Sequence, residues 1–484
     1  MSLSINFRLV SKASGLLLFI ETGFMFLSML VSMYYKEDVM ALFVPSLAIT
    51  FVTANILFLI GWKAKSSLGL REGFLIVSLA WVLFSFFGSL PFYLSGWIPT
   101  FESAFFESVS GFTTTGNTMV KNVEILPYGI LFWRSLTHWM GGMGIVIFTI
   151  AFLPLLKTGG LKLFSAESTG PMLAKIHPRI SDTSRRLWYV YMFLTALEIV
   201  LLCLEGMGTF DSVCQSFGTL AGGGFSTKNA SIGFWQSPII HYTITVFMFC
   251  SGVNFILLYF LLKGQLKRFW DNEELKWFLG FTLVTSLIIA AILYTNGYGG
   301  LEKSFRDALF QVTSAITTTG FSTVNYMAWN PLLWSLLLLV MIIGGSAGST
   351  AGGAKVVRVL LAMKNIRNDF HRFLHPNAVI PVRMDHSVVS QQVINNSIAF
   401  LFAYLLVIII SSLVLLATGM SFVNSIGSTI SSISNVGLAV GEFPSGTYAD
   451  IPVAAKWYLS FLMLVGRLEL YTLLMIFTPY FWRN

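Results

Sequence analysis

The sequence predicts an all-α integral membrane protein with ten transmembrane helices and four shorter re-entrant segments between them. Hydrophobic residues make up 55% of the 484 residues and charged residues only 11%. The mean hydropathy of +0.75 lies far above that of soluble domains. The apolar residues form long uncharged runs, and four short segments of similar sequence lie between these runs.

Ten apolar runs are long enough to span a bilayer. They cover residues 13–35, 39–62, 73–98, 128–156, 187–207, 239–262, 276–296, 332–363, 393–418 and 453–482. The first run is too long for the core of a signal peptide and lacks a small-residue cleavage site. We therefore expect it to be retained as a helix.

Lysine and arginine predict the orientation of the helices, because these residues are enriched in cytoplasmic loops. Basic residues follow the second, fourth, sixth and eighth runs, as at Lys63, Arg185, Lys267 and Arg367. Every second loop and both termini are therefore predicted to be cytoplasmic. This topology and the anionic inner leaflet account for the net charge of +8, so no nucleic-acid partner is expected.

Each outward-facing loop after the first helix pair contains a segment of about ten to twelve apolar and small polar residues, too short to span. Together with the residues that follow them, the segments read FESAFFESVSGFTTTGNT, FDSVCQSFGTLAGGGFST, FRDALFQVTSAITTTGFST and FVNSIGSTISSISNVGLAVG. When they are aligned on Gly116, Gly224, Gly320 and Gly437, the leading phenylalanine lies 15, 14, 15 and 15 residues upstream. A helix, re-entrant segment and helix therefore form a unit that repeats four times.

These repeats predict five parts of the chain. An additional N-terminal helix pair covers residues 1–70, and the four units cover 71–160, 161–265, 266–375 and 376–484. The second helix of the third unit is interrupted.

Irregular backbone is tolerated at membrane depth only where protein buries it or where it lines a water-filled cavity. One such segment alone would fit an ordinary small-residue packing interface. Four in common register favour a fourfold pseudo-symmetric ring around one central pore. Each short half-helix then ends at an extended stretch whose carbonyls face a passing cation.

Residues 344–354 interrupt the eighth run with the small-residue sequence GGSAGSTAGGA. Its five glycines are incompatible with a regular helix. The segment does not satisfy the phosphate-loop pattern, and no strand precedes it. A flexible plug across the pore fits the pattern, and so does a passive kink or packing seam.

Arg467 lies near the middle of the last apolar run, where a lone cation costs at least about 2.5–3.5 kcal/mol unless it faces protein or water. Glu469 lies two residues on and points elsewhere around a helix. We expect Arg467 to face the pore, where it opposes cation passage and binds carbonyls of the plug. A buried structural ion pair is the alternative.

Other ionisable residues are weaker candidates for a function. His138, Glu198 and Glu205 lie in or near apolar runs, where structural hydrogen bonds or interfacial positions are favoured over a proton relay. The short segments also carry acidic residues that concentrate cations at a pore mouth or are solvated surface charges. These are Glu102, Glu107, Asp211 and Asp307.

The whole chain resembles the Trk-type potassium uptake proteins, in the superfamily that includes the Ktr-type bacterial and plant high-affinity transporters. The resemblance rests on GFTTTG, GGGFST and TTTGFST, on RSLTHWMGGMGIV from Arg134, on GGSAGSTAGGAK from Gly344, and on GRLELYTLL from Gly466. The N-terminal helix pair is similar to the Trk branch.

The resemblance implies a potassium filter and a gate below it. The implied filter residues are Thr114, Thr115, Gly116, Gly222, Gly223, Gly224, Thr318, Thr319, Gly320, Asn435, Val436 and Gly437, whose backbone carbonyls bind the ion. The implied gate residues are Gly344, Gly345, Gly348, Gly352, Gly353 and Arg467. Glycine at all four signature positions implies a preference for potassium. The fourth segment departs from the family, since it reads NVGLAVG where relatives often read N-x-G-P-G.

The resemblance also implies the biological setting. We expect a multi-pass protein of the bacterial inner membrane, in contact with lipid, assembled as a homodimer and regulated by a separate cytosolic nucleotide-binding subunit. Potassium is the transported ion, and no organic cofactor is expected. Uptake through a pore and sodium- or proton-coupled symport both remain open. An enzyme is not expected, because no paired carboxylates, metal cluster or nucleophile and base set occurs at a plausible depth.

Overall fold

The computed structural model describes residues 5–37, 40–64, 70–142, 144, 180–375, 377–378, 380–385, 387–443 and 447–482. Within these ranges the regular structure is helical apart from one antiparallel hairpin, in which β1 (Arg383–Met384) pairs with β2 (Ser387–Val388). The predicted all-α class is therefore confirmed.

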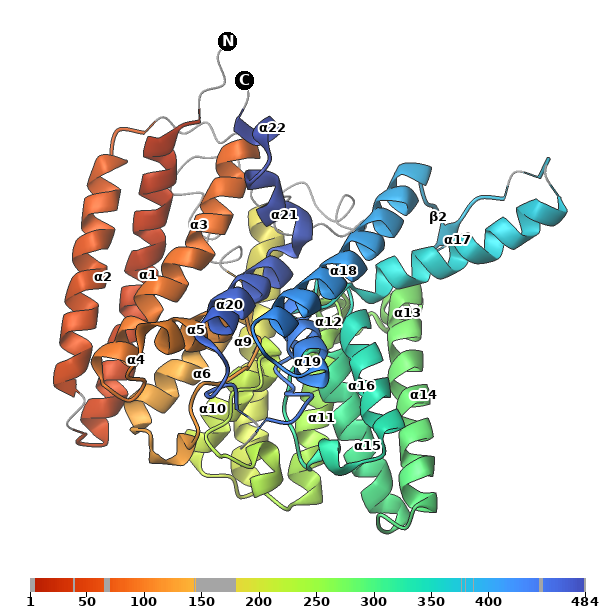
Figure 1. Cartoon of the computed structure of the whole chain (residues 1–484), viewed down its shortest axis with the longest axis horizontal. Helices are drawn as coiled ribbons and strands as arrows, with labels where there is room; N and C mark the ends of the chain where they lie inside the picture. Colours follow the sequence, from red (N-terminus) through yellow and green to blue (C-terminus); the bar gives the residue numbers. More distant parts are fainter. Residues whose placement is uncertain are drawn as a thin grey trace.

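Helices α1 (Phe7–Tyr34) and α2 (Met40–Ile60) lie side by side at one edge of the molecule (Figure 1). Small residues let the two backbones approach, since a Cβ atom on Gly15 would lie 2.8 Å from the Ala54 carbonyl oxygen. Helix α1 also packs against α3 and α6. The pair is thereby attached to the helices that follow it.

The remaining helices form a recurring series of a long helix, a short helix and a second helix. The long helices are α3 (Leu70–Gly88), α9 (Ile180–Leu204), α14 (Glu273–Thr295) and α18 (Gln391–Ala417). The short helices are α5 (Phe101–Phe112), α10 (Thr209–Ala221), α15 (Leu301–Ile316) and α19 (Phe422–Ile433). The second helices are α6 (Tyr128–Gly142), α11 (Pro238–Gly252), α16 (Pro331–Ile343) and α20 (Val453–Arg467).

The short helices have 12 to 16 residues. At about 1.5 Å per residue they cannot cross a hydrocarbon layer of about 30 Å. Each short helix packs against the long helix before it and against the second helix of the preceding series: α10 against α6, α15 against α11, α19 against α16 and α5 against α20. The last of these contacts joins the end of the chain to its beginning, so the four series form a closed arrangement.

Helix α17 and several shorter elements complete the described chain. They are α4 (Leu90–Leu94), α12 (Phe255–Leu262), α13 (Leu266–Trp270), α17 (Val356–Leu374), α21 (Glu469–Ile476), α22 (Pro479–Trp482) and the 3-10 turns η1 (Val123–Ile125), η3 (Ser231–Phe234) and η4 (Tyr326–Ala328). The start of α1 and helix α22 lie at the same end of the molecule (Figure 1). This is what two termini on one side of a membrane require.

Two predicted spans are wrong as continuous helices. The run 239–262 is divided into α11 and α12, which are bent by 114° at residues 253–254, and 453–482 is divided into α20, α21 and α22. The predicted interruption of the run 332–363 is confirmed, since this run ends as α16 and resumes as α17 after an irregular stretch. The run 128–156 is helical to Gly142, and most of the rest lies outside the described residues.

In the described part of the chain, six helices are long and apolar enough to cross a membrane, and the bent pair would make a seventh. They expose large apolar side chains, such as Val52 on α2 and Phe402 and Leu413 on α18. Such surfaces suit lipid and not water. The count of ten spans and the five predicted divisions of the chain stay predictions.

Candidate functional site

The four segments that follow the short helices share one backbone conformation. We call them the ring segments: residues 113–118, 221–226, 317–322 and 434–439. The φ angle is positive at Thr114, Gly222, Thr318 and Asn435, with values of 55°, 67°, 55° and 54°. It is positive again two residues later at Gly116, Gly224, Gly320 and Gly437, with values of 85°, 77°, 81° and 83°. Because positive φ is uncommon outside glycine, its recurrence at three non-glycine positions indicates an imposed conformation.

We call residues 114–116, 222–224, 318–320 and 435–437 the triplets. The middle residue of each triplet is held by an equivalent backbone hydrogen bond. Its N–H donates to the carbonyl five residues earlier, with a distance of 2.9 Å in all four cases: Thr115 to Ser110, Gly223 to Gly218, Thr319 to Ser314 and Val436 to Ser431. The chain therefore leaves each short helix in the same way, which places the four triplets at equivalent positions.

The triplets meet in a closed order. A Cβ atom added to Gly116 would overlap the Gly223 carbonyl oxygen, and one added to Gly224 would overlap that of Thr319. One added to Gly320 would overlap the Val436 oxygen, and one added to Gly437 would overlap that of Thr115. All four separations are under 3.0 Å, which real Cβ atoms essentially never show. Only glycine fits at these four positions, and the contacts close a ring of four segments.

Side-chain hydrogen bonds also support the ring, and they differ from segment to segment. The Thr113 and Thr115 hydroxyls are 2.8 Å apart, as are those of Thr317 and Thr319. In the fourth segment, the Asn435 side-chain amide donates to Thr115 Oγ1 at 2.9 Å, which ties this segment to the first.

The second segment has no polar side chain in its triplet, and His138 of α6 occupies the space beside it. A Cβ atom on Gly223 would lie 2.6 Å from the His138 ring, which stacks on Phe225 at 4.0 Å. His138 Nδ1 lies 2.7 Å from the Gly111 carbonyl oxygen. This is a structural hydrogen bond of the kind expected for His138.

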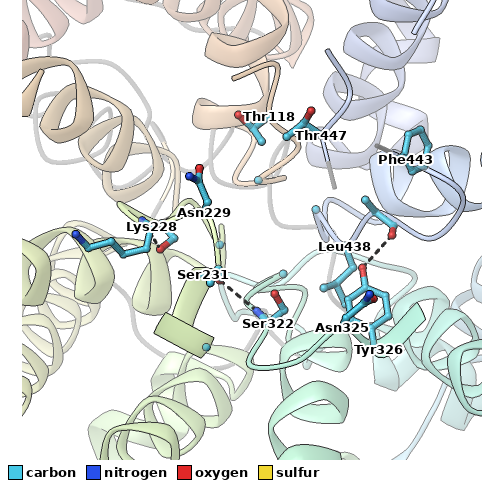
Figure 2. A pocket seen from close by; sticks show the side chains of 18 of the residues that line it. Thr118, Lys228, Asn229, Ser231, Ser322, Asn325, Tyr326, Leu438, Phe443 and Thr447 are labelled. Carbon is cyan, nitrogen blue, oxygen red and sulfur yellow. Dashed lines mark hydrogen bonds between the residues drawn. The ribbon is translucent and has the colours of Figure 1, made fainter. Parts of the chain in front are cut away.

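On one side of the ring, a cavity of about 1080 Å³ touches all four ring glycines and the loops that follow them (Figure 2). Its walls are tied across segments. The Ser322 N–H donates to Ser231 Oγ at 3.3 Å, and the Tyr326 hydroxyl donates to the Ala439 carbonyl at 3.0 Å (Figure 2). The cavity gives solvent a route to the ring from this side.

On the other side, the irregular residues 344–355 contact the parts of the ring segments that precede the glycines. We call these residues the 344–355 loop. The Gly352 N–H donates to Thr318 Oγ1 at 2.7 Å, and a Cβ atom on Gly352 would overlap the Ser434 carbonyl oxygen. Thr350 Oγ1 donates to the Leu220 carbonyl at 3.0 Å, next to the second segment. The loop therefore lies against three of the four segments.

The predicted gate glycines all lie in this loop, and three of them have positive φ: Gly344, Gly348 and Gly353, at 74°, 75° and 77°. All five also have close neighbours. A Cβ atom on Gly345 would lie 3.1 Å from the Gly252 carbonyl oxygen, and one on Gly352 would overlap the Ser434 carbonyl oxygen of the ring. The glycines thus give this segment its turns, and Gly352 gives it close contact with the ring.

Arg467 binds the loop from α20. Its guanidinium donates to the Thr350 carbonyl at 3.0 Å, to the Gly142 carbonyl at 3.0 Å and to the Gly141 carbonyl. The expected contact with a loop carbonyl is present. Its expected position in the middle of a helix is wrong, because α20 ends at Arg467 and Glu469 begins α21 with a φ of 50°. The helix breaks here, so the side chain can reach α6 and the loop together.

Glu469 forms an ion pair with Arg358 of α17, and the Arg358 guanidinium lies 4.0 Å from the Phe400 ring centroid. Glu469 therefore has its own cationic partner on another element.

Sequence reasoning missed an ion pair behind the first ring segment. Arg134 Nε donates to Glu107 Oε1 at 2.6 Å, and the two side chains are 4% and 0% exposed. Glu107 also accepts the Met119 N–H at 2.7 Å, and Arg134 donates to the Ser226 carbonyl at 2.9 Å. The pair thus joins the chain after the first ring segment to the second segment. The available signal was an arginine inside an apolar run with an acid in the preceding helix.

The prediction of mouth or surface acids is wrong for two of the four residues. Glu107 is fully buried in the ion pair, and Asp307 is only 2% exposed and accepts from the Tyr298 hydroxyl at 3.2 Å. Asp211 is half-buried and accepts from Thr227 Oγ1 at 2.7 Å. These carboxylates support the short helices and the loops beside the ring.

An apolar helical bundle, a ring of backbone carbonyls and glycines, and a loop against one side of that ring together define a class of protein: a multi-pass membrane transport protein. The chain belongs to the TrkH family of cation transport proteins, whose family model matches residues 42–483.

Known relatives agree over the whole length of the chain. The Trk system potassium uptake protein TrkH of Salmonella typhimurium is 39% identical, with 99% of this chain and 100% of the relative covered. The Trk system potassium uptake protein TrkG of Escherichia coli is 34% identical, with 99% of each chain covered. The crystal structure of the potassium transporter TrkH from Vibrio parahaemolyticus superposes with a TM-score of 0.87 at 35% identity, and the match covers 99% of this chain and 100% of that one. These relatives are transport proteins, and the chain is a transporter and not an enzyme.

Proposed function

We propose that this chain takes up potassium across the bacterial inner membrane through the ring, which acts as a selectivity filter. The observation that carries the proposal is the closed order of contacts between the ring glycines and the carbonyls of the neighbouring segments. Rings of backbone carbonyls can replace the hydration shell of a potassium ion. The names of the relatives, which are potassium uptake proteins, support potassium as the substrate.

The transported ion binds to backbone carbonyls of the four triplets 114–116, 222–224, 318–320 and 435–437. Positive φ at the first and third positions re-aims successive carbonyls, which an extended strand cannot do. The short helices also end at the triplets, so the partial negative charge of their C-terminal ends acts on the same ion. No side-chain carboxylate is needed at the ring itself.

The 344–355 loop and Arg467 form the gate below this filter. The loop lies against three ring segments, and the guanidinium bonded to Thr350 places a positive charge beside it. A cation leaving the ring on this side meets both the loop and that charge. Opening requires the loop to move and Arg467 to release its carbonyl partners.

The proposal also covers the setting of the transporter. Both termini face the cytoplasm, as the positions of Lys and Arg indicate. From the resemblance, the protein is a homodimer in the lipid bilayer and is regulated by a separate cytosolic nucleotide-binding subunit. Coupled symport with sodium or protons is the alternative that the experiment below distinguishes.

The test is potassium and sodium flux into liposomes that carry the purified protein, with and without a membrane potential. We expect potential-driven potassium flux in the native chain and a loss of preference for potassium in Gly320→Ser, because the new Cβ overlaps the Val436 carbonyl. Gly297→Ser is the matched control, since Gly297 has a φ of 73° but nothing within 4 Å of an added Cβ.

Potassium flux that requires a sodium or proton gradient would favour a symport mechanism over uptake through a pore. A native ion preference in Gly320→Ser would contradict the filter. An equal loss of preference in Gly297→Ser would attribute the effect to general backbone strain.

A further inference from the structure

The first turn of α14 binds the 344–355 loop through Glu274. The Ala347 N–H donates to Glu274 Oε1 at 2.7 Å, and Glu274 is 2% exposed. A hydrogen bond to a buried carboxylate is charge-assisted and stronger than a bond between neutral groups. This bond lies on the Ala347 side of the loop, whereas Arg467 binds the loop further along at Thr350.

The same turn of α14 binds the β1–β2 hairpin through Asp385. The Glu273 N–H donates to Asp385 Oδ1 at 2.8 Å, and the side-chain amide of Asn272, the N-cap of α14, donates to Asp385 Oδ2 at 3.2 Å. Asp385 lies between the two strands with a φ of 44°. Both carboxylate oxygens of the hairpin turn are therefore held at the N-terminus of α14, where a negative charge is stabilised.

Lys364 of α17 reinforces this junction. It forms an ion pair with Glu273, and its ammonium donates to the Arg383 carbonyl of β1 at 2.8 Å. Three consecutive residues, 272–274, thus join the hairpin and α17 on one side to the loop on the other.

An apolar cluster links the same elements independently. Ala347 of the loop packs with Val382 and Met384 of the hairpin region and with Leu360 and Leu361 of α17, all of them buried. A shift of the hairpin would therefore press on the loop through side-chain contacts as well as through the turn of α14. Packed cores of this kind move between discrete arrangements and do not deform freely.

We propose that Glu274 is a positioning residue of the gate, which holds the Ala347 side of the loop closed and couples the loop to the β1–β2 hairpin through one turn of α14. The hairpin is then the place where a movement outside the membrane opens or closes the pathway. This inference rests on the proposed function, because it assigns a coupling role to contacts of the proposed gate.

The test is the basal potassium flux of Glu274→Gln and Asp385→Asn in liposomes, together with hydrogen exchange of the peptide that contains Ala347. We expect Glu274→Gln to raise basal flux about tenfold without changing the preference for potassium, because an amide oxygen holds the Ala347 N–H less strongly than a carboxylate does. Exchange at Ala347 rises as well. Asp385→Asn raises both quantities by a smaller factor.

Glu72→Gln is the matched control. Glu72 lies in the first turn of α3 and accepts a backbone N–H from Asn6 at 3.1 Å, so it repeats the chemistry of Glu274 away from the loop. We expect native flux from this variant. The double variant of Glu274 and Asp385 should raise flux by less than the product of the two single-variant factors, because Asp385 acts partly through the turn that carries Glu274 and partly through the apolar cluster.

The inference is overturned by native flux and native exchange in Glu274→Gln, by an equal rise of flux in Glu72→Gln, or by additive effects in the double variant. If Glu274→Gln does not assemble, Asp385→Asn decides: raised flux supports the coupling and native flux contradicts it. A native ion preference in Gly320→Ser would contradict the filter but not the coupling. In that case, hydrogen exchange at Ala347 still tests whether the α14 turn holds the loop.

Discussion

The ring segments and the ends of the second helices differ in how far they repeat. All four ring segments share the same two positive φ positions and the same 2.9 Å hydrogen bond. The helices that follow them depart from one another. Helix α11 bends by 114° into α12, α16 opens into the 344–355 loop, and α20 breaks at Leu468.

The difference follows from how many neighbouring segments each region contacts. A ring segment contacts the segment before it and the segment after it, so a change of shape in one segment would break two contacts of a closed ring. The ends of the second helices need not match one another, and the 344–355 loop that follows α16 lies against three ring segments. Equivalence is therefore required in the ring segments, whereas the ends of the second helices can differ.

The largest expected effect comes from the buried ion pair behind the first ring segment. Arg134→Met leaves the Glu107 carboxylate buried without its cation, which we expect to destabilise the protein by about 3–5 kcal/mol. The measurement is the melting temperature of the purified protein in detergent. The double variant Glu107→Gln with Arg134→Met should recover part of the loss, and a single variant as stable as the native chain would contradict the importance of this pair.

The next effect tests whether the first and fourth units pack alike. A Cβ atom on Gly141 would overlap the Phe112 carbonyl oxygen, and one on Gly466 would overlap that of Ile433, in each case the last residue of a short helix. Each substitution by alanine should cost about 1–3 kcal/mol through overpacking. Gly280→Ala in α14 is the control, because an added Cβ there meets nothing within 4 Å. Unequal melting temperatures for the two variants would limit the equivalence to the ring.

The gate should control how much ion passes and not which ion passes. Arg467→Gln removes the charge and weakens the bonds to Thr350, Gly141 and Gly142, so basal potassium flux should rise about tenfold while the potassium-to-sodium ratio stays native. The surface variant Arg268→Gln provides the comparison in the same liposome assay. A changed ratio with unchanged flux would place Arg467 in the filter.

The smallest effect is expected beside the cavity next to the ring, which Lys121 lines. Lys121 and Asp450 form an ion pair at 2.6 Å with 60% and 55% of their side chains exposed. Because exposed pairs contribute less than about 1 kcal/mol, Asp450→Asn should change the melting temperature little, and any change should vanish at high salt. A large drop in the melting temperature of this variant would mean that the cavity wall helps to hold the ring segments together.

The four ring glycines could be predicted from the sequence because their positions depend on residue type. Gly116, Gly224, Gly320 and Gly437 stand in one register, and glycine is needed both for positive φ and for contact with a neighbouring carbonyl. The interruption at 344–354 could be predicted for the same reason, since five glycines leave no regular helix. Local chemistry was sufficient in both cases.

The helix breaks and the buried ion pairs could not be predicted, because distant residues cause them. A few small and polar residues within the apolar run 239–262 do not specify the bend after Gly252, where an added Cβ would lie 2.8 Å from side-chain atoms of Phe278 and Thr317. Asn254 then caps α12, and the Phe255 N–H donates to the Gly348 carbonyl at 3.1 Å. Glu107 likewise has the sequence features of a surface acid, because its partner Arg134 lies in another helix and is brought beside it only by the fold.

The central claim is that the four triplets form one cation site, and crystals grown in a thallium salt test it most directly. Thallium substitutes for potassium and scatters anomalously, so the account predicts an anomalous peak inside the ring, equidistant from the carbonyl oxygens of Thr115, Gly223, Thr319 and Val436. The peak should disappear in Gly320→Ser. A ring without a peak in a protein that still transports potassium would contradict the account.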